Sequence, residues 1–209
     1  AQRPYLITDS LVVSAGTTLQ LAAGTRLFFH AGTSLIVHGT LKAQGTVDHP
    51  VIFRGARLGE MFSGQPYDRI PNQWGGVVLT RQSVDNVLNF CDIHSGAFGI
   101  RCDSTGIDRR KLLLENSIIH NVGGHGLYAK DCHTEVGNTQ ISNSAGDCVH
   151  LVGGQHNFTH CTLAQFYPFI GTRGVALRFS NTENQQRNPL HGANFINTLI
   201  TGSNSDDLM

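Results

Sequence analysis

One position of a repeated pattern in this 209-residue chain collects side chains that could act in acid–base chemistry. Five segments can be aligned on their apolar residues. Two residues before the last apolar residue of each, they carry in order Phe98, His125, Asp147, Arg173 and Asp206. Paired carboxylates beside a base are what the cleavage of a glycosidic bond requires. Asp147, Arg173 and Asp206 are therefore the candidate catalytic residues of the chain.

The spacing of the two carboxylates also limits what they could do. Asp147 and Asp206 lie two segments apart, hence about 9–10 Å if the segments stack as strands, near the upper limit for an inverting hydrolase. A lyase would need Ca²⁺ held by several acidic oxygens beside its base, and only these two carboxylates flank Arg173. Calcium is possible but unsupported, so no cofactor is expected. Asp147 could instead cap its own turn.

Histidines form a second set of candidate ligands. The alignment places His94 over His120, which would suggest a metal. The next residue in that column is Ser142, and no carboxylate or third histidine joins it. The sequence therefore predicts stacked surface imidazoles and no metal site. Four further histidines fall in different columns and are not expected to converge: His133, His150, His156 and His160.

Aromatic residues in the predicted loops offer a way to hold a sugar without catalysis. A sugar ring can stack on an aromatic face while nearby polar groups hydrogen-bond to its hydroxyls. The candidate ligand-binding residues are Tyr67, His125, Phe166, Tyr167 and Phe169. The alternative is that the loops fold back and bury these rings in a small core of their own.

All of these residues would be positioned by a repeat of about 22 residues. The segment 114–129 recurs as 136–151, with Ile119 matching Ile141 and Leu127 matching Val149. Such a period, built of short apolar–polar alternations, is typical of a solenoid. Three apolar anchors recur in the five segments: Leu88, Leu114, Val136, Phe158 and Phe195; Ile93, Ile119, Ile141, Leu163 and Ile200; and Ile100, Leu127, Val149, Val175 and Leu208. Three anchors per coil predict a three-faced, all-β solenoid of parallel strands.

Two further columns fall at the predicted corner before the central anchor. One consists mostly of asparagine: Phe90, Asn116, Asn138, His160 and Asn197. The next consists of small residues: Cys91, Ser117, Thr139, Cys161 and Thr198. Both columns predict ladders of side chains that stack along the axis at a turn.

The chain is expected to form a single domain, 1–209, in three parts. Residues 1–55 repeat Gly-Thr-x-Leu every eight residues, from Gly16, Gly24 and Gly32, and predict narrow first coils. Residues 56–73 break the pattern and predict an inserted loop. Residues 74–209 hold the larger coils. Because the sequence stops within a coil, we expect an interior fragment of a longer chain that could carry further domains.

Composition excludes several classes of function. Fifteen basic and fifteen acidic residues balance, so no electrostatic footprint for nucleic acid is present. No apolar run is long enough to be a transmembrane segment. The N-terminus is not a signal peptide, so an export signal is expected to have been removed or to lie upstream. Five cysteines without a CxxC pair predict scattered buried thiols, with at most one disulfide.

The chain resembles the right-handed parallel β-helix proteins of the pectate-lyase-like superfamily. The resemblance rests on the Gly-Thr-x-Leu opening, the Gln73-Trp74-Gly75-Gly76-Val77 entry strand and the Ile/Leu-x-Asn coils, and it covers nearly the whole length. More narrowly, the chain is similar to uncharacterised β-helix proteins of gut-bacterial cell surfaces, often lipoproteins. This resemblance implies an extracytoplasmic location, at the bacterial cell surface or in the periplasm. The run 146–149 also resembles a polygalacturonase stretch but lacks its second aspartate.

Three functions are consistent with these observations. The leading hypothesis is a non-catalytic glycan-binding or scaffold module of the cell surface, whose partner is a polysaccharide or oligosaccharide. The alternative is a polysaccharide hydrolase or lyase that uses Asp147, Arg173 and Asp206. A structural stalk or adhesin that binds a protein partner is the third hypothesis.

Overall fold

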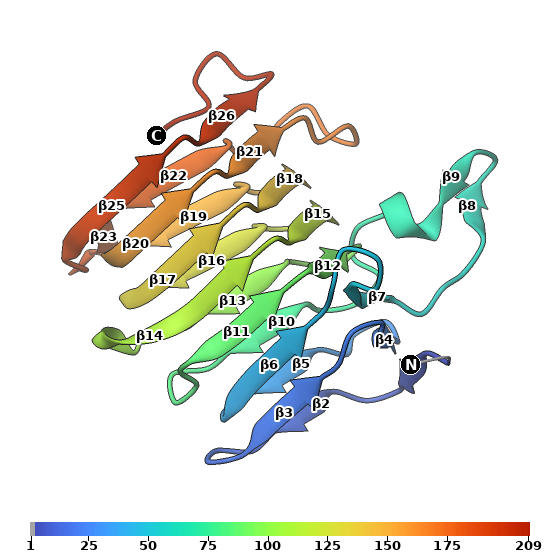
Figure 1. Cartoon of the computed structure of the whole chain (residues 1–209). Coiled ribbons are helices and arrows are strands. Elements are labelled where there is room, and N and C mark those ends of the chain that lie inside the picture. The colour runs from blue at the N-terminus through green and yellow to red at the C-terminus, as the bar shows by residue number, and fades with distance from the viewer. Residues whose placement is uncertain (1–2) are drawn as a thin grey trace.

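The chain folds into a right-handed parallel β-helix, and the computed structural model describes residues 3–209 (Figure 1). Each coil contributes one strand to each of three parallel sheets, which we call sheets A, B and C. The prediction of an all-β, three-faced solenoid is confirmed. Within the described residues the only helical segment is the 3₁₀ turn η1 (Tyr67–Arg69), and none has the length and apolar character to span a membrane.

The strands of each sheet follow one another at intervals of one coil. Sheet A consists of β1 (Tyr5–Ile7), β4 (Arg26–Phe29), β7 (Val51–Gly55), β12 (Cys91–His94), β15 (Ile118–Val122), β18 (Gln140–Ser144), β21 (Thr162–Gln165) and β26 (Leu199–Gly202). Sheet B consists of β2 (Leu11–Val13), β5 (Leu35–Val37), β10 (Val77–Leu79), β13 (Ile100–Cys102), β16 (Leu127–Lys130), β19 (Val149–Val152) and β22 (Leu177–Ser180). Sheet C consists of β3 (Thr18–Leu21), β6 (Thr40–Gln44), β11 (Asn86–Asn89), β14 (Gly106–Glu115), β17 (Cys132–Gly137), β20 (Gly154–Thr159) and β25 (Leu190–Ile196).

The core lies between the three sheets and is built from the predicted anchors. Ile93, Ile119 and Ile141 pair in register through sheet A, and all three are fully buried. Successive residues of a strand point to opposite faces, so the residues between these anchors point outward. Aromatic rings stack along the same axis, as Phe158 does on Phe195 with 4.9 Å between ring centroids. The core is therefore one continuous column of side chains.

The corner between sheets C and A shows why asparagine recurs there. Every residue of the predicted asparagine column has a positive φ, between 45° and 57°. Asparagine tolerates this left-handed conformation better than most side chains. The side-chain amides also form the expected ladder, because Asn138 donates to Asn116 and Asn116 to Asn89, each at 2.8 Å. In the adjacent small-residue column, Ser117 Oγ accepts the backbone N–H of Cys91 at 3.0 Å.

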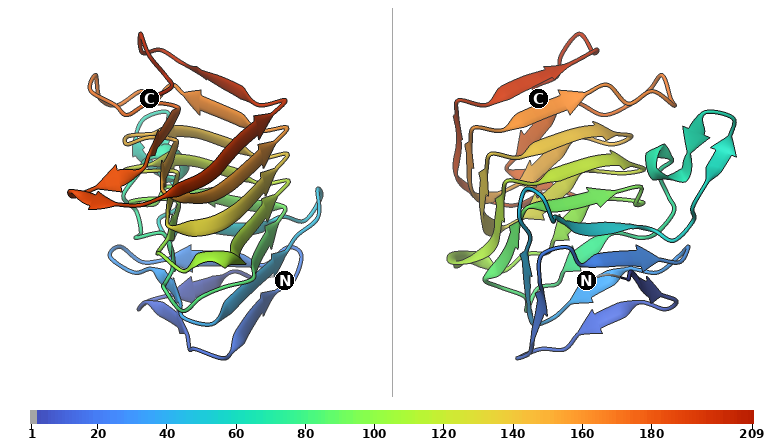
Figure 2. Two further views of the ribbon diagram at one scale, coloured as in Figure 1. Left: turned by 90° about the vertical axis from the view of Figure 1, so that its left-hand side faces the viewer. Right: turned by 45° about the vertical axis from the view of Figure 1, so that its right-hand side comes forward.

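Two short hairpins project from the coils. The chain between β7 and β10 forms β8 (Glu60–Phe62), β9 (Gln65–Pro66) and η1, which lie outside the stack beside sheet A (Figures 1 and 2). The second hairpin, β23 (Thr182–Glu183) and β24 (Gln186–Arg187), follows β22 and extends away from the coils (Figure 2). Trp74 ends the first excursion and is buried on Phe29, with ring centroids 4.4 Å apart.

One predicted anchor is wrong. Val149 pairs with Leu177 and not with Val175, and Leu177 in turn pairs with Leu208. The wide turn that follows β21 holds two residues more than the alignment allowed, which moves the sheet B anchor of that coil from Val175 to Leu177. Arg173 consequently lies four residues before the sheet B anchor of its coil. Val175 lies two residues before the anchor Leu177, just as Asp147 lies two residues before the anchor Val149 one coil earlier.

Most buried polar side chains are hydrogen-bonded. All five cysteines are buried and free, which confirms the predicted thiols and leaves no disulfide among them. His156 is fully buried on β20. Its Nε2 donates to the Gly153 carbonyl at 2.7 Å, so its Nδ1 accepts the Thr134 hydroxyl at 2.8 Å. The ring is therefore held in one neutral tautomer.

Adjacent isoleucines of β15 allow a direct test of the predicted alternation. We expect Ile119→Ala to lower the free energy of unfolding by about 2–5 kcal/mol, because it opens a cavity in the core. Ile118→Ala, its neighbour and matched control, should cost less than about 1 kcal/mol, since that side chain is 43% exposed. Urea unfolding followed by circular dichroism measures both. Equal losses would contradict the assigned faces.

His156 should make the protein sensitive to acid. Burial lowers the pKa of His156 from 6.5 to about 4. Because the folded state resists protonation, the stability from this group is present above pH 6.5 and is lost as the pH falls towards 4. The loss is on the order of 3 kcal/mol. Urea unfolding at pH 7 and pH 4 should show a smaller pH-dependent loss in His156→Gln than in the wild type. The same loss in both proteins would refute this assignment.

Candidate functional site

Residues 3–209 contain two groups of histidines and carboxylates close enough to hold a metal ion, on different sheets. One consists of His125, Asp147 and His150 beside sheet B, where His125 also lines an open cleft of roughly 670 Å³ on the outer face of the sheet. The other lies on the outer face of sheet A, under the inserted loop. Each group combines histidines with a carboxylate that could share a metal ion with them.

The cleft, here called the sheet B cleft, begins from one outward-facing column. Arg101, Tyr128 and His150 lie over one another on β13, β16 and β19, and Arg178 follows on β22. The cleft extends along Arg101 and Tyr128 of this column and along the turns beside them. Its lining residues are Arg81, Ala97, Phe98, Arg101, Asp103, Ser104, Gly124, His125, Tyr128, Lys130 and Glu183.

The far wall of the sheet B cleft comes from the second hairpin. Glu183 of β23 accepts the Tyr128 hydroxyl at 2.8 Å and pairs with Lys130 Nζ at 2.7 Å. The hydrogen bond from Lys130 lowers the pKa of Glu183, against the effect of burial. Burial and the same glutamate raise the pKa of Tyr128. Glu183 is therefore a carboxylate and Tyr128 a neutral hydrogen-bond donor near neutral pH.

The cleft presents rings and polar groups together. His125 and Tyr128 lie with ring centroids 6.0 Å apart and an interplanar angle of 25°. Arg101, whose side chain is 48% exposed, pairs with Asp103 at 3.0 Å. These side chains give the cleft an aromatic floor flanked by hydrogen-bond donors and acceptors that solvent can reach.

Behind this floor, Asp147 is held in place by its neighbours. It is 3% exposed, its Oδ1 accepts the Val175 backbone N–H at 2.9 Å, and its Oδ2 accepts Arg178 Nε at 2.8 Å. Its own backbone N–H donates to His125 Nδ1 at 3.0 Å. Asp147 thus links two coils and does not cap its own turn, and its partner is Arg178 rather than Arg173.

The three candidate catalytic residues do not form one group. The guanidinium of Arg173 donates to the Tyr167 carbonyl at 2.9 Å and to Ser203. Asp206 is exposed. Among residues 3–209 no hydrogen bond or ion pair joins Asp147, Arg173 and Asp206. Of the five residues predicted on that turn, Phe98 and His125 line the sheet B cleft.

The loop aromatics are divided between core and surface. Tyr167 is 4% exposed, so it does not offer a ring to a ligand. Phe166 and Phe169 are about half exposed on the wide turn, and Tyr67 lies in the inserted loop beneath Arg57. None of these four residues lines the sheet B cleft.

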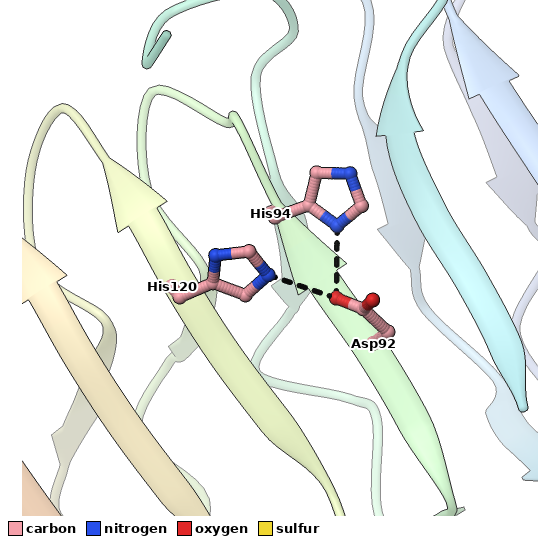
Figure 3. A group of neighbouring side chains, drawn as sticks. All are labelled: Asp92, His94 and His120. Atoms are coloured by element: carbon pink, nitrogen blue, oxygen red, sulfur yellow. Dashed lines mark hydrogen bonds and ion pairs between the residues drawn. The ribbon is translucent and has the colours of Figure 1, made fainter. Parts of the chain in front are cut away.

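The second group, here called the His94 cluster, consists of Asp92, His94 and His120 (Figure 3). Asp92 and His94 are two residues apart on β12 and share its outer face, and His94 pairs with His120 on β15. One oxygen of Asp92 accepts both rings, His94 Nδ1 at 2.8 Å and His120 Nε2 at 3.2 Å. The prediction that no carboxylate joins these histidines is wrong.

The inserted loop covers the His94 cluster. Asp68 of η1 forms an ion pair with Arg54 of β7 and lies 3.6 Å from His94 Nε2. His94 is 6% exposed, so it is not the surface imidazole that the sequence predicted. Burial would lower its pKa, but the neighbouring carboxylates of Asp68 and Asp92 prevail and raise it to about 9. The hydrogen bonds from His120 and His94 likewise hold the pKa of Asp92 down against burial.

One further sequence-based expectation is corrected by these contacts. His150 does converge with His125, with its Nδ1 3.5 Å from His125 Nε2. Neither Asp92 nor the Arg101 column was predicted as part of a site, although a sequence pattern points to each. Asp92 precedes His94 by two residues, the spacing of one strand face. The Arg101 column directly follows each sheet B anchor.

The comparisons with known proteins add no family. A scan against protein-family models finds no match, and a search of the curated proteins finds none either.

The anchoring of the second hairpin can be tested by proteolysis. We expect Glu183→Ala to increase the rate at which trypsin cleaves after Arg187 severalfold, because the hairpin loses its contacts with Tyr128 and Lys130. Glu135→Ala is the matched control, since it removes a partly exposed carboxylate and its Arg110 ion pair from sheet C. Mass spectrometry of the digests identifies the site. An unchanged rate in Glu183→Ala would refute this anchoring.

Proposed function

We propose that the chain is a non-catalytic carbohydrate-binding module that holds a segment of glycan in the sheet B cleft. The observation that carries this proposal is the aromatic floor of the cleft, formed by His125 and Tyr128 between accessible polar side chains. Sugar rings pack on such faces, while their hydroxyls exchange water for side-chain hydrogen bonds. A solenoid flank suits an extended partner, because its columns repeat along the axis.

A binding role is supported over a hydrolytic one by the state of the carboxylates. A hydrolase needs one carboxyl group that is protonated near neutral pH, which requires a raised pKa. The pKa of Glu183 is instead lowered by Lys130. Asp103 pairs with Arg101, and Asp147 is buried against Arg178. The chemistry of these groups favours hydrogen bonding to a ligand over proton transfer.

Two further parts of this proposal are a relationship of the chain to pectate-lyase-like proteins and its location at a bacterial cell surface. Their support is the parallel β-helix fold together with the sequence resemblance, and the binding test does not depend on them.

Tyr128 provides the sharpest test of glycan binding. Plant and mucosal polysaccharides on an array identify a ligand, and calorimetry with an oligosaccharide from it gives the affinity. We expect Tyr128→Ala to weaken binding by about tenfold, because a stacked ring contributes on the order of 1 kcal/mol. Tyr128→Phe keeps the ring and loses only the hydroxyl that Glu183 accepts, so it should bind within about threefold of the wild type.

The controls separate the sheet B cleft from the wide turn. Phe169→Ala removes a 44% exposed ring outside the cleft and should leave the affinity unchanged. Absence of any binding on the array, or equal affinity in Tyr128→Ala and the wild type, would refute the proposed function.

A further inference from the structure

The His94 cluster places three metal-binding side chains on one outward face. Asp92 and His94 share the face because they are two residues apart on β12, and His120 lies over His94 because the coils stack in register. Figure 3 shows both imidazole rings directed at a single oxygen of Asp92. One ligand atom of each residue lies within 4.8 Å of the other two.

The distances fit ligands that share an ion. Two ligands at right angles on a metal with bonds of about 2.1 Å are separated by roughly 3.0 Å. Asp92 Oδ1 lies 2.8 Å from His94 Nδ1 and 3.2 Å from His120 Nε2, on either side of that value. Small rotations of the three side chains suffice to admit an ion in place of the imidazole protons.

An independent observation comes from the other nitrogen of His94. Nε2 of this buried ring has no hydrogen-bond partner among the described residues and faces Oδ1 of Asp68 at 3.6 Å, an oxygen that also pairs with Arg54. A histidine that binds a metal commonly donates its second N–H to a carboxylate, which fixes the ring. Asp68 holds that position for His94.

We propose that Asp92, His94 and His120 bind a divalent first-row transition-metal ion, and that Asp68 couples the inserted loop to it. Two imidazoles and one carboxylate suit ions such as Zn²⁺, Fe²⁺ or Co²⁺, whereas Ca²⁺ and Mg²⁺ prefer oxygen ligands alone. The side chains of Asp92 and His120 are 32% and 26% exposed, so an ion can enter and keep positions for water or another ligand.

The other histidine group, beside sheet B, offers a poorer set of metal ligands. Asp147 is the only carboxylate of the group formed with His125 and His150, and Arg178 occupies its Oδ2. A cation there would lie beside a guanidinium, and His125 Nδ1 already accepts a backbone N–H. This group therefore serves as an internal comparison.

The proposal is tested with Zn²⁺ alone. After removal of metals with EDTA, calorimetry of the intact chain should show one Zn²⁺ per molecule. His120→Gln and Asp92→Asn should each weaken binding more than tenfold, and Asp68→Asn about tenfold through the orientation of His94. His133→Gln is the matched control, because it removes an imidazole that faces a single carboxylate, Glu135 at 3.5 Å. Its affinity should equal that of the wild type.

Circular dichroism in EDTA shows whether each variant is folded. X-ray absorption of the Zn²⁺-loaded wild type needs no variant and should show two imidazole ligands. The proposal is overturned if the wild type binds no Zn²⁺, if the absorption spectrum lacks imidazole scattering, or if His150→Gln abolishes binding in place of His120→Gln.

Discussion

The hydrogen-bonded stacking of parallel strands in register constrains everything else in this molecule. Each coil must place its residues over those of the coil before, so a side chain of one type is repeated along the axis as a column. Inward columns form the core through Ile93, Ile119 and Ile141. Corner columns need a left-handed residue, which is why Asn116 and Asn138 stack at the same turn. Outward columns have no packing requirement and are free to carry chemistry.

Among the described residues, three excursions leave the stack of coils and bring further side chains to it: the inserted loop, the second hairpin and the wide turn after β21. A residue within a coil can contact only its neighbours above and below, whereas an excursion can bring a distant residue onto an outward column. Asp68 reaches His94 from the inserted loop, and Glu183 reaches Tyr128 from the second hairpin. Arg173, on the wide turn, reaches Ser203 of the next coil. Both candidate sites lie where an excursion meets an outward column.

This division explains which parts could be predicted from the sequence. The anchors of sheets A and C were correct throughout, because the period there is set by strand stacking. Val175 was assigned in place of Leu177 because a wide turn can lengthen without disturbing the strands on either side. The predicted catalytic group included Arg173 only because the alignment assigned too few residues to the wide turn. Glu183 could not have been found, since no periodicity relates a hairpin to the column on which it folds.

The two histidine groups show how neighbours decide the chemistry of the same residue types. In the His94 cluster, burial works against the charged ring, yet the neighbouring carboxylates of Asp68 and Asp92 prevail and raise the pKa of His94 to about 9. In the group formed by His125, Asp147 and His150, burial lowers the pKa values of both histidines, and Arg178 adds to the effect on both. Two imidazoles that converge on one carboxylate oxygen are suited to a metal cation, whereas a neutral imidazole beside an arginine is suited to hydrogen-bond a polar ligand. The outward columns of one solenoid can thus present a cation site on sheet A and a ligand-binding surface on sheet B, with the difference set by which carboxylates and cations face each ring.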